Sequence, residues 1–160
     1  MPSRPDPLGP EGARFWASLD ALVASATLII DRPCGSAHPR FPAFLYPLDY
    51  GYLEGTSACD GGGIDVWVGS LQPREVVGVL ACADLAKRDA EIKLLLGCTS
   101  QEELTVLEFH NSGTQAAMLV RTASPSAPPI WREVLTRPEA SPARSGGAGL
   151  RPGQHLAPDG

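Results

Sequence analysis

Four aspartates occupy positions at the ends of predicted strands, where carboxylates can meet. Asp60 and Asp65 lie around a glycine turn, and Asp84 and Asp89 lie around the connection of a predicted hairpin. Opposed residues of an antiparallel hairpin approach to about 5 Å, a distance at which two carboxylates repel each other unless a proton or cation lies between them. Mg²⁺ is the natural bridge because it prefers oxygen ligands. Each pair is thus a candidate Mg²⁺ site, although either pair alone is more often an ordinary charged turn.

Short strands are expected to position these carboxylates. Residues 64–68 predict a strand because apolar residues alternate with Asp65 and Trp67. Residues 76–83 and 91–96 predict a hairpin, with residues 85–88 as its connection. Further strands are expected at residues 27–30 and 44–53, and helices at residues 10–23 and 100–110. The second helix is expected to begin with a capping box of Ser100 and Glu103, and residues 115–121 fit either a helix or a strand.

Residues 45–52, with the sequence LYPLDYGY, together with Thr56, Asp60 and Asp65 resemble the soluble family I inorganic pyrophosphatases. The signature of that family is an aromatic YPxNYGY strand followed by a D-x-D-x-x-D loop. Residues 78–80 and 84–89 resemble the family's second acidic hairpin. The resemblance covers about residues 30–97. It implies a mainly β fold with flanking helices, built as a small five-stranded OB-like barrel, and Mg²⁺-dependent hydrolysis of pyrophosphate to two phosphates.

The resemblance also implies roles for individual residues. The metal ligands it implies are Asp60, Asp65, Asp84 and Asp89. Asp65 and Tyr50 would lie at the catalytic centre, where metal-activated water attacks phosphorus. Substrate contacts are expected from Arg40, Tyr46 and Lys93, while Asp31 stands at the edge of the site where the family has a Glu.

Two positions depart from the pattern of the family. Gly62 replaces the middle carboxylate of the aspartate loop, and Glu91 replaces a phosphate-binding lysine. A general base typically contributes about 10²–10⁴-fold to a rate, so its loss need not end hydrolysis. The lost positive charge matters more, because cations stabilise the transferring phosphoryl group. Two alternatives therefore stay open: a module that binds metal and phosphate compounds without turnover, and a hydrolase of another phosphate compound.

Composition divides the chain of 160 residues into one domain and two terminal segments. Of its 16 prolines, four lie in residues 1–10 and seven in residues 122–160. The C-terminal segment is rich in Ser, Ala, Pro and Gly and cannot bury enough apolar surface to offset its ordering entropy. We therefore expect a folded domain at residues 11–121, between a disordered start at 1–10 and a disordered tail at 122–160.

The net negative charge of the domain and the lack of long apolar runs limit the kinds of partner that the protein can bind. Residues 11–121 carry 14 Asp and Glu against eight Lys and Arg, and an acidic domain of this kind repels nucleic acid. No apolar run approaches the roughly 18–20 residues of a membrane span, and the start lacks the layout of a signal peptide. Four scattered cysteines are typical of reduced thiols. We expect a cytoplasmic protein that acts on a small molecule, with no nucleic-acid or membrane partner and with homo-oligomers as a possibility.

Overall fold

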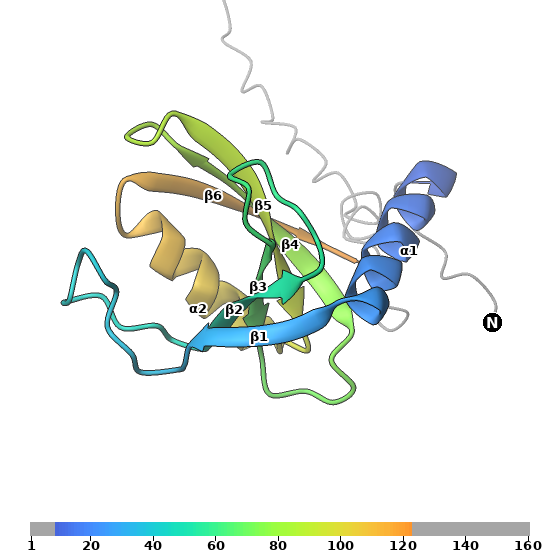
Figure 1. Cartoon of the computed structure of the whole chain (residues 1–160), viewed down its shortest axis with the longest axis horizontal. Helices are drawn as coiled ribbons and strands as arrows, with labels where there is room; N and C mark the ends of the chain where they lie inside the picture. The colour runs from blue at the N-terminus through green and yellow to red at the C-terminus, as the bar shows by residue number, and fades with distance from the viewer. Residues whose placement is uncertain (1–8, 123–160) are drawn as a thin grey trace, which may run out of the picture. The chain divides into compact units, whose positions relative to one another are not determined.

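Two helices and six strands build the part of the chain that the computed structural model describes, residues 9–122. The predictions for residues 1–10 and 122–160 lie outside the described residues except at three positions: Gly9 and Pro10 begin the first helix, and the Thr122 N–H donates to the Val77 carbonyl. The elements are α1 (Gly9–Ser25), β1 (Thr27–Arg32), β2 (Asp49–Glu54), β3 (Ile64–Val68), β4 (Val76–Asp84), β5 (Asp89–Leu96), α2 (Ser100–Asn111) and β6 (Gln115–Arg121) (Figure 1).

All six strands belong to one sheet, in the order β1-β2-β3-β5-β4-β6. Neighbouring strands are antiparallel except β3 and β5, which run parallel. Among the described residues, β1 and β6 form the two edges and do not pair with each other. The predicted mainly β fold with flanking helices is therefore confirmed, but the five-stranded barrel is wrong: the sheet has six strands and stays open.

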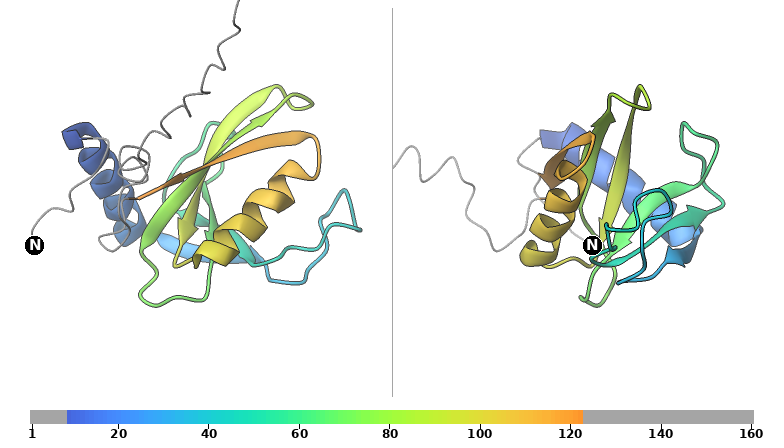
Figure 2. Two further views of the ribbon diagram at one scale, coloured as in Figure 1. Left: turned by 180° about the vertical axis from the view of Figure 1, so that it is seen from behind. Right: turned by 90° about the vertical axis from the view of Figure 1, so that its left-hand side faces the viewer.

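The sheet is buried on both faces, each under one helix (Figure 2). The pleat of β3 shows this, because Val66 and Val68 belong to one apolar cluster and Trp67, between them, belongs to the other. Trp16 and Leu19 of α1 complete the first cluster, and residues of α2 complete the second. Fully burying a Val or Leu side chain contributes about 1.5–3 kcal/mol to the stability of the fold. The alternating pattern of residues 64–68 thus separates two cores rather than a core from solvent.

Residues 33–48, between β1 and β2, form an irregular loop that folds back on itself. The Gly35 N–H donates to the Tyr46 carbonyl over 2.8 Å, and the His38 N–H donates to the Phe44 carbonyl over 2.8 Å. The predicted strand at residues 44–53 is therefore wrong in its first half, since β2 begins only at Asp49. The physical reason is Pro47, which has no N–H to donate to a strand ladder.

Two further details of the secondary structure differ from expectation or resolve it. The capping box of α2 consists of Thr99 and Glu102, one residue earlier than predicted. Glu103 is instead buried, and its carboxylate accepts a hydrogen bond of 2.6 Å from Arg121 Nε of β6. Residues 115–121, which fitted either element, form strand β6. Within the described residues, neither helix is long and apolar enough to cross a membrane.

Candidate functional site

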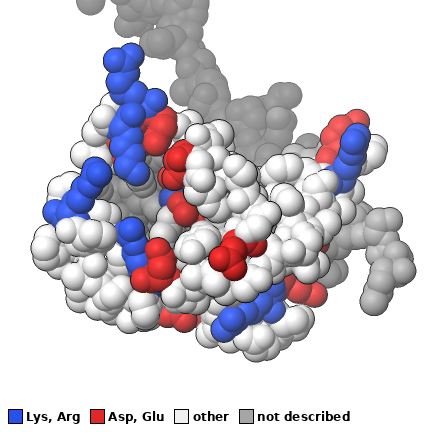
Figure 3. Space-filling model, in the orientation of Figure 1, with Lys and Arg blue, Asp and Glu red and all other residues white. Residues whose placement is uncertain are grey.

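A cavity of about 660 Å³ opens on the face of the sheet that α2 covers. Its walls come from the end of β1, the 33–48 loop, β2, β3, β4, β5, the end of α2 and the start of β6. Basic and acidic side chains are mixed on this part of the surface (Figure 3). The cavity brings together seven of the predicted site residues: Arg40, Tyr46, Tyr50, Asp60, Asp65, Asp84 and Lys93.

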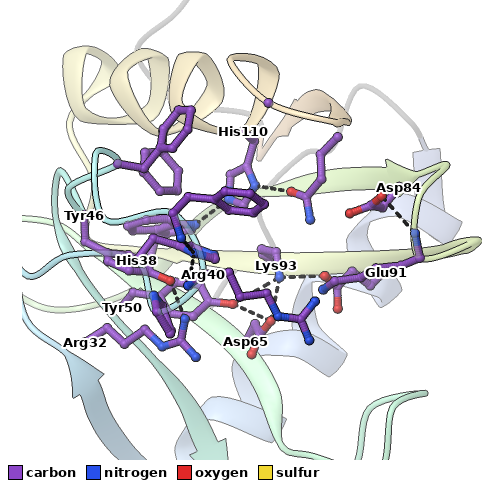
Figure 4. Close-up of a pocket in the computed structure, with 18 of the residues that line it drawn as sticks. Arg32, His38, Arg40, Tyr46, Tyr50, Asp65, Asp84, Glu91, Lys93 and His110 are labelled. Carbon is purple, nitrogen blue, oxygen red and sulfur yellow. Dashed lines mark hydrogen bonds and ion pairs between the residues drawn. The ribbon is translucent and has the colours of Figure 1, made fainter.

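Lys93 lies at the centre of the polar contacts in this cavity (Figure 4). Its ammonium group is 2.5 Å from Asp65 Oδ2, 2.7 Å from Glu91 Oε1 and 3.1 Å from the Tyr50 hydroxyl. The Tyr50 hydroxyl itself donates to Asp65 Oδ2 over 2.5 Å. Only 4% of the Lys93 side chain is exposed, so the charge of the ammonium is neutralised inside the protein by two carboxylates.

The protonation states of this cluster follow from its surroundings. Burial lowers the pKa of Lys93, but Tyr50, Asp65 and the hydrogen bonds to Asp65 and Glu91 raise it by more, so its pKa lies above the usual value and the lysine stays charged. Burial, more than the nearby carboxylate of Asp65, raises the pKa of Tyr50 well above its usual value. Tyr50 is therefore a neutral phenol that donates a hydrogen bond to Asp65, and it is not a base at neutral pH.

Strand geometry explains why Lys93 reaches Asp65. In the parallel pairing of β3 with β5, Val66 is opposite Leu94 and Trp67 is opposite Leu95. Asp65 and Lys93 are the residues immediately before this pairing, so their side chains leave neighbouring strands at the same level. Gly51 allows β1 to approach β2 closely next to Tyr50, because a side chain at Gly51 would overlap the backbone of Ile29.

A second polar group in the cavity is built around His110. Trp67 Nε1, which can only donate, donates a hydrogen bond to His110 Nε2 over 3.0 Å. His110 Nδ1 lies 2.7 Å from Gln115 Oε1 and therefore carries the proton. Burial lowers the pKa of His110 to about 4, in agreement with the neutral ring that these contacts require. The network connects β3, α2 and β6 through a buried imidazole, which indicates a structural role.

Arg32 and the tip of the 33–48 loop form the opposite wall. Arg32 Nη1 donates to the Tyr46 hydroxyl over 2.5 Å, and its Nε is 4.0 Å from Asp31. His38 stacks on Tyr46 with ring centroids 6.0 Å apart. Because His38 Nδ1 accepts from the backbone N–H groups of Arg40 and Phe41, the loop tip is fixed by its own histidine.

The remaining predicted metal ligands have other partners. Asp84 Oδ1 accepts the N–H groups of Ala86 and Lys87, and the bond from Lys87, more than any other influence, lowers the pKa of this carboxyl. Asp60 Oδ1 accepts the Gly62 N–H over 3.0 Å. Asp89 is opposite Asp84 in the hairpin register, as predicted, but is exposed and does not line the cavity. Asp60 and Asp84 thus act as turn residues here.

This arrangement does not match the Mg²⁺ site that the sequence predicted. Within residues 9–122, no three His, Cys, Asp or Glu side chains are close enough to hold one metal ion together. Asp65 is the central ligand of the predicted set, and its Oδ2 already accepts hydrogen bonds from Lys93 and Tyr50. An ammonium therefore stands where a divalent cation was expected, and Mg²⁺ binding stays a prediction.

Several cavity residues were missed from the sequence. Arg32, Lys87 and His110 line the cavity but are not among the predicted site residues. The available signals were the helical spacing of His110 from Val106 and the position of Arg32 directly after Asp31. The contacts themselves depend on segments that are far apart in the chain, such as the 43 positions between Trp67 and His110.

Comparison with known proteins finds partial structural alignments with inorganic pyrophosphatases. No family model and no curated protein sequence matches the chain. Among solved structures, the inorganic pyrophosphatase of Coxiella burnetii aligns at 17% identity with a TM-score of 0.45, over 61% of this chain and 84% of that one. The enzyme of Helicobacter pylori aligns at 15% identity and 0.45, over 61% and 83%. That of Thermus thermophilus aligns at 20% and 0.44, over 59% and 80%. These likenesses concern backbone arrangement alone.

Proposed function

We propose that the cavity binds a small phosphate compound, with pyrophosphate as the first candidate. The observation that carries the proposal is a set of basic side chains whose charge is available to a ligand. Among the described residues, Arg40 and Lys87 line the cavity and form no ion pair with a carboxylate. Arg32 also lines the cavity; it donates a hydrogen bond to the Tyr46 hydroxyl, and its one ion pair among the described residues is the contact of 4.0 Å with Asp31. Guanidinium groups suit phosphate because they donate two parallel hydrogen bonds.

Lys93 contributes to this binding in a different way. Its charge is already neutralised by Asp65 and Glu91, so it holds the two carboxylates together and limits their repulsion of an anion. The mixed charges of the cavity also suit a phosphate that carries a cation of its own. Binding without turnover, one of the alternatives left open by Gly62 and Glu91, is the function that this geometry supports best.

Titration calorimetry with pyrophosphate, in EDTA and again in Mg²⁺, tests the proposal. Arg40→Ala and Lys87→Ala are each expected to weaken binding by about tenfold, the effect of losing about 1.4 kcal/mol of charge-assisted hydrogen bonding. Arg74→Ala is the matched control, because Arg74 is exposed and does not line the cavity. Absence of pyrophosphate binding in both buffers, or equal losses in all three variants, would contradict the proposal.

Mg²⁺-dependent hydrolysis of pyrophosphate is the second candidate. Asp60, Asp65 and Asp84 favour it because all three line the same cavity as the basic residues. Phosphate release that requires Mg²⁺, is lost in EDTA and disappears in Asp65→Asn would support it. Release that survives EDTA, or that Asp65→Asn leaves unchanged, would exclude this candidate. Binding without release would leave the first proposal standing.

A further inference from the structure

The cavity has two chemically different ends (Figure 4). His38 and Tyr46 lie at one end, Glu91 and Asp84 lie at the other, and Arg40 and Lys93 lie between them. Three phenylalanines also line the cavity: Phe41 and Phe44 from the loop and Phe109 from α2. Pyrophosphate has only charged groups and would make no stacking contact with these rings.

The aromatic rings are held in place by one another. Phe44 meets both Phe41 and Phe109 edge to face, each with ring centroids 6.3 Å apart. Phe41 also lies against His38, at 5.3 Å. These contacts, together with the His38 turn that fixes the loop tip, preorganise the rings without any ligand.

Phe41 nevertheless keeps 55% of its surface exposed, although it lines the cavity. A large aromatic side chain that is fixed in position and open to a cavity offers a face on which a planar ring can stack. The volume of about 660 Å³ falls within the roughly 300–1,000 Å³ that is usual for sites of drug-sized ligands. The space therefore accommodates a ring and a phosphate at the same time.

We infer that the ligand is an organic phosphate with a planar ring, of the size of a nucleotide, whose phosphate lies toward Arg40 and Lys87 and whose ring lies against Phe41 and Phe44. This inference rests on the proposed function, since it assigns the class of phosphate compound to the same cavity. The ring adds affinity through stacking, and the basic residues hold the phosphate.

The test compares two phosphate monoesters, AMP and ribose 5-phosphate, which differ in the aromatic base. Calorimetry on the full chain at constant ionic strength is expected to show AMP binding about tenfold more tightly. Phe41→Ala removes most of this difference and leaves the affinity for ribose 5-phosphate within about twofold. Leu45→Ala, a control on the same loop that is 57% exposed and outside the cavity, leaves both affinities unchanged.

Phe44→Leu gives a second, apolar variant in case Phe41→Ala disturbs the loop, which circular dichroism would reveal. It too is expected to reduce the preference for AMP. Equal affinities for AMP and ribose 5-phosphate in the unaltered chain would overturn the inference, and so would a preference that both variants retain. If pyrophosphate still binds in either case, the proposed function stands without this inference. If none of the three compounds binds, both fail.

Discussion

The ammonium of Lys93 lies 2.5 Å from Asp65 Oδ2, which joins β5 to β3 inside the cavity. Glu91 Oε1 contacts the same ammonium at 2.7 Å. Because the lysine is almost fully buried and both carboxylates are largely shielded, the three charges depend on each other. Removing the central cation would leave two carboxylates facing each other with no compensation.

Lys93→Met is therefore expected to lower the free energy of unfolding by about 3 kcal/mol, measured by urea denaturation. Lys87→Met is the matched control, since it removes a lysine from the exposed rim of the same cavity and is expected to change stability by less than about 0.5 kcal/mol. Similar losses in the two variants would show that the Lys93 cluster does not contribute as described.

Mg²⁺ is expected to stabilise Lys93→Met more than it stabilises the unaltered chain. In the unaltered chain Lys93 forms ion pairs with Asp65 and Glu91. Lys93→Met leaves both carboxylates free to bind a divalent cation. A ligand present at 100 times its Kd adds about 2.7 kcal/mol to stability. In thermal denaturation without phosphate, Mg²⁺ should raise the midpoint of Lys93→Met more than that of the unaltered chain. The opposite order would show that Lys93 does not compete with the metal.

Gly62→Asp tests whether the missing carboxylate limits hydrolysis. A Cβ at this position would meet only the Asp60 side chain, at 3.3 Å, and Gly62 has no positive φ. We expect a change in stability below about 1 kcal/mol. If the hydrolysis candidate holds, Mg²⁺-dependent phosphate release should rise at least about tenfold, the lower part of what a general base supplies. Gly62→Asn, of equal size but without charge, should give no increase; an increase there would contradict a role for the carboxylate.

His110 is expected to make the protein sensitive to acid. Its pKa is 6.5 in an unfolded chain and about 4 when folded, so between these values the unfolded state binds a proton that the folded state does not. The free energy of unfolding should therefore fall as the pH decreases from about 6.5 to about 4, by up to about 3 kcal/mol. Above pH 6.5 both states hold a neutral ring, and this contribution is constant.

Urea denaturation across this pH range measures the effect. His110→Gln keeps an acceptor for Trp67 Nε1 but does not titrate, so it should flatten most of the slope. His38→Gln is the control, because His38 is half-buried on the loop and should leave most of the slope in place. If His110→Gln retains the full slope, the imidazole is not its source.

Arg121 is expected to stabilise the docking of α2 on β6. Glu103 is only 4% exposed, and Arg121 Nε donates to it over 2.6 Å. Arg121→Met leaves a buried carboxylate without its charged donor and should cost about 1–3 kcal/mol of unfolding free energy. Adding Glu103→Gln to this variant should restore part of the loss. A double variant no more stable than Arg121→Met alone would show that the pair is not coupled.

Local patterns predicted the elements better than the contacts between them. Residues 64–68 were predicted as a strand with two faces, and β3 has these bounds, because alternation is a property of the segment itself. The start of β2 was misplaced because aromatic content suggested a strand where Pro47 prevents one. The capping box was shifted by one residue because Thr99 and Glu102 have the same spacing and chemistry as Ser100 and Glu103.

Many residues that line the cavity were singled out from the sequence, but their contacts with one another were not. Lys93 was expected to contact substrate, which stays a prediction, and only the parallel register of β3 and β5 shows that it contacts Asp65. Asp84 and Asp89 are opposite each other as expected, yet Asp84 turns to the backbone of the hairpin connection. A short carboxylate can satisfy either a turn or a metal, and spacing alone does not decide between them.

The parallel pairing of β3 with β5 also sets an order of events during synthesis. β4 leaves the ribosome before β5, yet β5 occupies the place beside β3, so β3 has no partner on that side until Leu96 has been made. Until β5 has been made, Asp65 also lacks Lys93, the lysine with which it pairs. A nascent chain in which β3 has already paired with β2 would therefore carry an unsatisfied strand edge and an unpaired carboxylate together, and the insertion of β5 would complete both.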